Sequence, residues 1–172
     1  MMFSPSAVMT EANAANPGRS ILAIDYGRQR MGLALSDTLG MTARPLLIMA
    51  RSNRRGDLSR LREICRRHNV GTIIVGWPLH LDGSASDMGH EAARFAERVR
   101  RNLGLPVHLV DERLSSWEAR QTLETTTPGG GRKDVDDVAA AIILRDYLSQ
   151  VRRAAHSQSA EGRAPQDTAA KG

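Results

Sequence analysis

The stretch Ile21-Leu-Ala-Ile-Asp-Tyr-Gly-Arg-Gln-Arg-Met-Gly-Leu-Ala-Leu-Ser36 holds two short apolar runs on either side of a polar turn. The runs, Ile21 to Ile24 and Gly32 to Ser36, have the length and composition of strands, and the turn Gly27 to Arg30 predicts a hairpin. A third apolar run, Leu46 to Met49, continues the meander. The folded part of the chain therefore begins with antiparallel strands.

Downstream of this meander, helical and strand patterns alternate. Asp57 is a suitable N-cap for a helix that reaches Cys65, and a second amphipathic helix is predicted from Ser86 to about Asn102. The remaining predicted elements are strands at Thr72–Val75 and Leu105–Val110, a short helix from a capping box at Ser115 and Glu118 to about Thr125, and a last helix from about Asp134 to Leu148. The order β-β-β-α-β-α-β-α-α predicts an α/β fold, a mixed five-stranded sheet with helices on both faces.

The composition fits one domain between two polar tails. A chain of 172 residues can bury roughly two-thirds of its extended surface in a single core. Residues 1–18 and 153–172 lack a sustained apolar period, so we expect disordered tails around a domain at 19–152. Cys65 is the one cysteine, which excludes a disulfide framework and favours a buried structural thiol. We find no signal peptide or membrane-spanning run and expect a soluble, cytoplasmic protein.

The charge of the chain favours a polyanionic partner. The formal net charge is +5 and the sequence pI is about 10.3. Lys133 and Lys171 are the only lysines among 24 basic residues, so nearly all the positive charge is arginine. A coding bias toward arginine explains that excess as well as a nucleic-acid surface does, so the net charge supports nucleic acid without proving it.

Acidic residues stand at three places that the predicted sheet brings to one edge. Asp25 ends the first strand, Asp111 and Glu112 end the last, and Asp136 and Asp137 lie in the first turn of the final helix. Ligands of open α/β sheets gather at the carboxyl ends of parallel strands. Carboxylates suit Mg²⁺ or Mn²⁺, and two such ions about 4 Å apart can drive phosphodiester hydrolysis. Each acid alone is more often a turn former or a cap, so only their coincidence carries the hypothesis.

Four segments of the sequence resemble the YqgF or RuvX family, described as Holliday-junction-resolvase-like proteins and pre-16S ribosomal RNA nucleases. They follow the order and spacing of the family over roughly residues 20 to 150, and together they are highly specific. The matching segments are Ile24-Asp-Tyr-Gly-Arg-Gln-Arg-Met-Gly-Leu-Ala-Leu-Ser-Asp37, Ile74-Val-Gly-Trp-Pro-Leu-His-Leu-Asp-Gly-Ser84, Val110-Asp-Glu-Arg-Leu-Ser-Ser116 with Glu118-Ala119, and Lys133 with Val135-Asp136 and Ala139-Ala140.

The resemblance implies an RNase H-like fold and a metal-dependent nuclease that uses Mg²⁺ or Mn²⁺. It carries over Asp25, Glu112 and Asp136 as catalytic and metal-binding residues, whereas Asp137 stands where the family varies and is interpreted as a cap. Alternation along the strand leaves open whether Asp111 or Glu112 enters the site, because a strand end can bulge. We favour Glu112 and keep Asp111 as the alternative.

Basic residues close to these motifs are candidates for contacts with nucleic-acid phosphates: Arg28, Arg30, Arg113 and Lys133. Each of them could equally be a solvated surface charge. Trp77 and His80 replace an aliphatic residue and an asparagine that are common in the family. Trp77 either stacks on a base or fills an apolar gap.

Three other functions stay open as alternatives to a ribosomal RNA nuclease. A Holliday-junction resolvase would act on branched DNA as a symmetric homodimer, for which the sequence marks no interface. A binding module without catalysis would not need the retained acids Asp25, Glu112 and Asp136. A sugar-kinase or actin-like ATPase would need a second domain around its nucleotide, for which 172 residues leave no room. The resemblance favours structured RNA, in the 5′-end maturation of precursor 16S ribosomal RNA.

Overall fold

The predicted hairpin is present as strands β1 (Ser20–Asp25) and β2 (Arg30–Ser36) in the computed structural model, which describes residues 18–114 and 133–161. The two strands pair antiparallel, with Leu22 opposite Leu35. Strand β3 (Ala43–Ala50) pairs antiparallel with β2 and completes the meander. The N-terminal strands therefore form as their apolar runs indicate.

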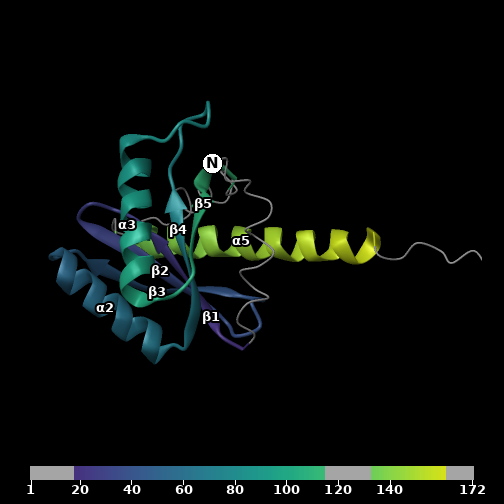
Figure 1. Ribbon diagram of the computed structural model, residues 1–172, viewed down its shortest axis with the longest axis horizontal. Coiled ribbons are helices and arrows are strands. Elements are labelled where there is room, and N and C mark those ends of the chain that lie inside the picture. The colour runs from purple at the N-terminus through teal and green to yellow at the C-terminus, as the bar shows by residue number, and fades with distance from the viewer. Residues whose placement is uncertain (1–17, 115–132, 162–172) are drawn as a thin grey trace, which may run out of the picture.

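Two parallel strands extend the sheet beyond the meander. Strand β4 (Val70–Trp77) pairs with β1, and β5 (Val107–Asp111) pairs with β4, so the sheet order is β3-β2-β1-β4-β5. Helices α2 (Arg54–Arg67) and α3 (Asp87–Leu103) make the crossovers, and α5 (Lys133–Glu161) lies across the other side of the sheet (Figure 1). This mixed sheet with helices on both faces confirms the predicted RNase H-like fold class.

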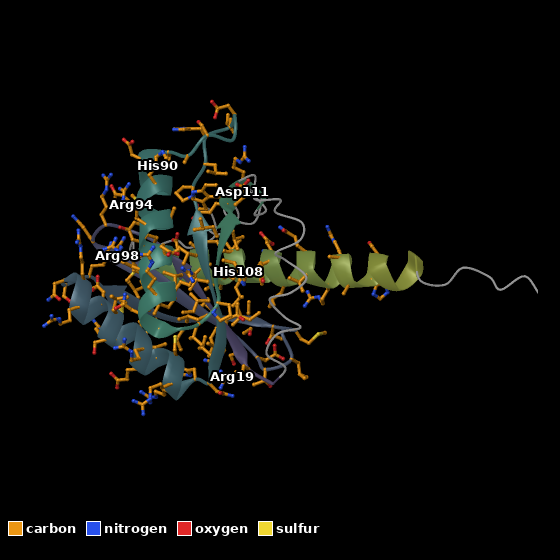
Figure 2. All side chains as sticks on the ribbon, in the orientation of Figure 1. Arg19, His90, Arg94, Arg98, His108 and Asp111 are labelled. Carbon is orange, nitrogen blue, oxygen red and sulfur yellow. The ribbon has the colours of Figure 1, made fainter. Side chains whose placement is uncertain are left out.

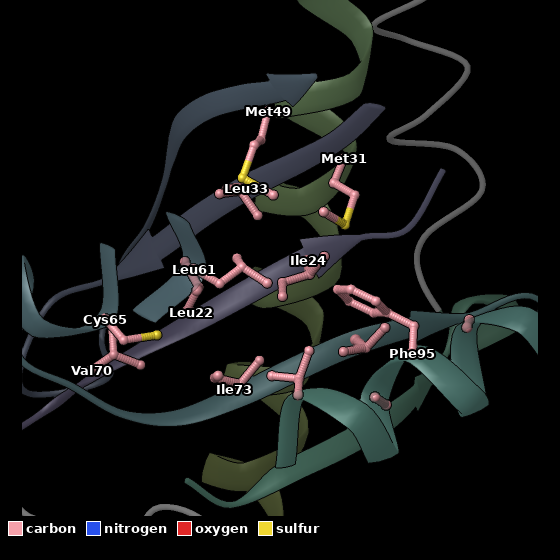
Figure 3. Close-up of a cluster of buried hydrophobic side chains, with 14 of the residues drawn as sticks. Leu22, Ile24, Met31, Leu33, Met49, Leu61, Cys65, Val70, Ile73 and Phe95 are labelled. Carbon is pink, nitrogen blue, oxygen red and sulfur yellow. The ribbon is translucent and has the colours of Figure 1, made fainter. Parts of the chain in front are cut away.

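Side chains alternate between the two faces of the sheet, and each face contributes to its own hydrophobic core. On β1, Leu22 and Ile24 pack with α2 and α3 in the core that Figure 3 shows in part. Ile21 and Ala23 pack with α5 in the second core. Asp25 is the next residue in that second row, so its position on the strand faces α5.

The start of α2 differs from the prediction that Asp57 is its N-cap. The N-cap is Asn53, whose side chain accepts a hydrogen bond from the Gly56 amide at 2.9 Å. Asp57 is only 2% exposed and accepts hydrogen bonds from the Ser52 amide and the Arg51 guanidinium. It therefore anchors the connection from β3 inside the protein, which its sequence position after a glycine did not reveal.

Helix α5 continues to Glu161, nine residues past the domain end expected at 152. Val151 is the last residue of the helix in the second core, and Arg152, Arg153 and His156 are exposed. The residues after Val151 show no apolar periodicity, so the sequence pattern predicts a tail there. They are rich in arginine, alanine and glutamine, which have high intrinsic helix propensity, and the helix therefore continues. The helix predicted at 115–125 and most of both tails lie outside the described residues. None of the helices of the described ranges is long and apolar enough to span a bilayer.

Candidate active site

The ends of three neighbouring strands bring Asp25 and Glu112 to the same edge of the sheet. Ile24 pairs with Val75, and Gly76 pairs with Val110, so Asp25 ends β1 one residue after its last pair with β4. Glu112 begins a short 3₁₀ turn (Glu112–Leu114) directly after β5. Both carboxylate residues therefore stand at the carboxyl ends of parallel strands, where open α/β sheets bind ligands.

The Glu112 side chain packs directly against the backbone of Gly76. A methyl group on Gly76 would overlap Oε1 of Glu112 and would lie 3.0 Å from Cδ1 of Ile143 on α5. The Glu112 carboxylate thus occupies the space above β4 on the α5 side of the sheet. Gly32 lies opposite Asp25 on β2, so a second strand also offers no side chain at this position. Because Gly76 has no side chain, the Glu112 carboxylate can lie directly against β4.

Asp111 belongs to a different contact network. Arg113 donates to both Asp111 carboxylate oxygens, with the shortest distance 2.7 Å from Nη2, and its backbone amide donates to Oδ1. Burial acts to raise the pKa of the Asp111 carboxyl, but the hydrogen bonds and charge of Arg113 outweigh it and hold that pKa below its ordinary value. This geometry favours Glu112 over Asp111 as the metal ligand.

The third predicted acid, Asp136, lies in the first turn of α5. It stands four residues before Ala140 and seven before Ile143, in the row of positions that packs on the sheet. Its side chain, like that of Lys133, is outside the described residues. The described side chains alone contain no group of three candidate metal ligands. The set of Asp25, Glu112 and Asp136 therefore stays a prediction, although the backbone brings α5 to the right face.

The basic residues predicted to contact nucleic acid have different surroundings in the structure. Arg28 forms an exposed ion pair with Glu91 on α3 at 2.8 Å. Arg30 opens β2 opposite Ala50 and is half-buried. Arg113 also donates to the main-chain oxygens of His80 and Leu81, so it fastens the loop after β4 to the end of β5. Their roles toward nucleic acid stay predictions.

Trp77 fits the interpretation of an apolar gap filler. Its Nε1 is buried with no hydrogen-bond partner among the described residues. A methyl group on Gly89 of α3 would lie 3.4 Å from that nitrogen. The indole therefore packs against the start of α3. The His80 side chain is exposed, and its main chain closes the loop through a hydrogen bond to Ser84.

Sequence reasoning missed Arg51, which organises the turn after Asp25. Its guanidinium donates to the Gly27 carbonyl at 3.1 Å, pairs with Asp57 at 3.1 Å and lies 4.9 Å from the centre of the Tyr26 ring. A cavity of about 290 Å³ opens beside it. Arg51 also lies 5.6 Å from the centre of the Phe95 ring, so its partners come from three separate segments and nothing in the sequence marks it.

A family model and the curated relatives point to one family. A family model described as "RuvX: Holliday junction resolvase" matches residues 19–150. A Koribacter versatilis protein named "Putative pre-16S rRNA nuclease" is 39% identical over 144 residues, which cover 83% of this chain and 93% of the relative. A Geobacillus kaustophilus protein of the same name is 41% identical over 135 residues, with coverages of 76% and 98%.

Among solved structures, RuvC from T. thermophilus in complex with a Holliday junction substrate is similar with a TM-score of 0.48 and 17% identity. The match covers 77% of this chain and 96% of RuvC. The fold assignment rests on the sheet order described above and not on this likeness.

Proposed function

The chain belongs to the RuvX family, and from that premise we propose that it is a divalent-metal-dependent endonuclease that hydrolyses phosphodiester bonds. Its proposed substrate is precursor 16S ribosomal RNA, at the 5′ end of the mature sequence, in the cytoplasm. The observation that carries the proposal is the Glu112 carboxylate above Gly76, at the strand ends that also hold Asp25. The names of the relatives support the choice of substrate.

The residues at this edge fit Mg²⁺ or Mn²⁺. Asp25, Glu112 and Asp136 would hold the cation through carboxylate oxygens, which are the donors that hard cations prefer. When bound, the metal supplies the Lewis acidity that activates water and stabilises the leaving oxygen. Close carboxylates repel one another, so a cation also relieves the cost of gathering them.

The protein itself orients the carboxylates. Ile143 and Gly76 confine the Glu112 side chain between α5 and β4, which limits the positions its oxygens can take. Asp25 is fixed at the end of a strand that is hydrogen-bonded on both sides. Such preorganisation places the ligands before the substrate arrives and is a large part of what an enzyme contributes to catalysis.

The second candidate function is Holliday-junction resolution, which the description of the matching family favours. A resolvase cuts two strands and needs two sites in a symmetric homodimer. A third candidate, a binding module without catalysis, would leave the carboxylates unused. The three functions differ in what is cut and in whether anything is cut.

The test is cleavage of labelled precursor 16S RNA and of a labelled four-way DNA junction, with Mg²⁺ or Mn²⁺. We expect the wild type to cut the RNA, and Asp25→Asn, Glu112→Gln and Asp136→Asn each to lower the rate by at least about 100-fold, the typical weight of a catalytic carboxylate. Asp111→Asn is the matched control, because it removes a neighbouring carboxylate that binds Arg113. It should lower the rate by less than about tenfold.

Each alternative predicts a different result in the same assay. Cutting of the junction but not of the RNA would make the protein a resolvase. Tight binding without cutting of either substrate would make it a binding module. Loss of activity in Asp111→Asn but not in Glu112→Gln would reverse the assignment of the ligand.

A further inference from the structure

Helices α2 and α3, on the face of the sheet opposite α5, carry the whole excess of positive charge. Together they hold ten arginines and five acidic residues. This excess of five equals the formal net charge of the complete chain, +5. Helix α5 holds four basic and five acidic residues. A coding bias raises the arginine content everywhere, so it does not explain why one face is basic and the other is not.

The acidic residues of these helices leave most of their arginines unpaired. Asp57 is buried against Arg51, and Glu91 pairs with Arg28 from the turn after β1. Glu97 pairs with both Arg100 and Arg101, at 2.8 and 2.6 Å. Among the described residues, no carboxylate forms an ion pair with the other arginines of α2 and α3, which we call the arginine face: Arg54, Arg55, Arg60, Arg62, Arg66, Arg67, Arg94 and Arg98.

The arginines of the two helices adjoin where α2 contacts the end of α3. His90, Arg94 and Arg98 follow one another at four-residue intervals down the length of α3 (Figure 2). Arg62 of α2 donates to the Asn102 carbonyl of α3 at 2.9 Å, so the two basic rows adjoin. Helix α3 has 17 residues. At about 1.5 Å per residue it is roughly 25 Å long, which is enough to run beside several base pairs of a duplex.

We propose that the arginine face binds the phosphate backbone of a duplex segment of the substrate, separate from the strand that is cut. The inference rests on the proposed nuclease function. Exposed guanidinium groups suit phosphate oxygens through paired hydrogen bonds, and such contacts position a nucleic acid without reading its sequence. The proposed carboxylate site is on the α5 side of the sheet, whereas the arginine face is on the other side.

This arrangement defines the class of substrate. A straight duplex lies along one face of the sheet, so it cannot contact the arginine face and deliver a strand to Glu112 at the same time. The two faces meet at the carboxyl ends of the strands, where the cavity lined by Tyr26, Arg28 and Arg54 opens beside the turn after Asp25. The substrate is therefore bent or branched, with a duplex on α2 and α3 and a strand that passes over this edge.

The first experiment measures how RNA binding depends on salt. The probe is a labelled RNA hairpin with a stem longer than α3 and a single-stranded flank, and the protein carries Asp25→Asn so that nothing is cut. The test variant adds Arg55→Gln, Arg66→Gln and Arg94→Gln, which are exposed and unpaired. The control variant instead adds Arg44→Gln, Arg145→Gln and Arg153→Gln, which are exposed residues of β3 and α5 and remove the same charge.

The test variant should lose three phosphate contacts. Each contact contributes about 0.7–0.9 to the slope of log affinity against log salt, so the slope should fall by about 2–3 and the affinity by on the order of 100-fold near 0.15 M salt. The control variant should keep the wild-type slope within about one contact. Equal losses in the two variants, or none in the test variant, would overturn the proposal.

A second readout separates this proposal from the proposed function. With Asp25 restored, the test variant should raise the KM for the substrate that the wild type cuts and leave kcat within about threefold, because the arginines lie away from the carboxylates. Unchanged KM would overturn the arginine face even if the enzyme is active. A wild type that binds the hairpin with the expected slope but cuts nothing would refute the nuclease and leave the binding surface intact.

Discussion

Replacing Gly76 by alanine should separate catalysis from stability. The added methyl group would overlap Oε1 of Glu112 and press on Cδ1 of Ile143 at 3.0 Å. Both atoms are the ends of flexible side chains that can shift, so the loss of folding free energy should lie at the lower end of the range of about 1–3 kcal/mol that overpacking costs. Relief of the overlap requires the Glu112 carboxylate to move by on the order of 1 Å, a displacement that costs about 100-fold in rate when it affects a catalytic group.

The assay measures two quantities on the same protein preparations: the rate at which labelled precursor 16S RNA is cleaved, and the melting temperature. Ile73→Val is the matched control, because Ile73 lies three residues earlier on β4 and its buried side chain faces α2 and α3. It should cost about 0.5–1.5 kcal/mol in stability with little change in rate. The Mn²⁺ concentration for half-maximal activity should rise in Gly76→Ala and not in Ile73→Val.

The reasoning fails if Gly76→Ala cleaves at the wild-type rate with unchanged metal dependence. Such a result would mean that the Glu112 carboxylate is either free to move without consequence or not part of the site. A rate loss equal to that of Ile73→Val at the same loss of stability would mean that Gly76 matters only for packing.

Three further predictions concern buried groups. Tyr147→Phe should raise the free energy of unfolding by about 1 kcal/mol, because the buried hydroxyl has no partner among the described residues; a decrease in the melting temperature would contradict this. Burial lowers the pKa of His108, so the unfolded chain binds the proton more readily and stability should fall as the pH drops below about 6.5; His108→Leu should reduce that fall in denaturation measured at several pH values. Burial raises the pKa of the Cys65 thiol to about 11, so alkylation of the native protein should be much slower than of the unfolded chain, and rapid native labelling would show that the thiol is accessible.

The fold could be predicted because its signals are local and repeated. The apolar runs of β1, β2 and β4 and the spacing in α2 and α3 each specify an element, and the crossover rule then limits their arrangement. The N-cap of α2 was predicted wrongly, since Asn53 and Asp57 are both good caps by residue type. Asp57 does not cap the helix because its carboxylate forms a buried ion pair with Arg51. This pairing can be recognised only from the folded structure.

The sequence alone could predict that acidic residues gather at the strand ends, but it could not predict which side chains each of them contacts. Strand ends indicated where the carboxylates gather, but alternation could not distinguish Asp111 from Glu112. The distinction depends on Arg113, which binds Asp111, and on Gly76, which accommodates Glu112. The contact between Gly76 and Glu112 joins residues 36 positions apart in the chain, so the local sequence could not show it. The arginine face was missed because net charge does not show how charges are distributed over a surface.

Helix α5 has a consequence for the order in which the protein is made. Its residues cover β1, β2 and β3, and Arg152 donates to the carbonyls of Gly40 and Met41 in the turn between β2 and β3. A chain is synthesised from its N-terminus, so the sheet emerges from the ribosome before the helix that covers it. Until α5 has emerged, the nascent chain lacks Asp136. If the proposed site needs Asp136, a newly made chain would be unable to cleave RNA until its last helix has packed on the sheet.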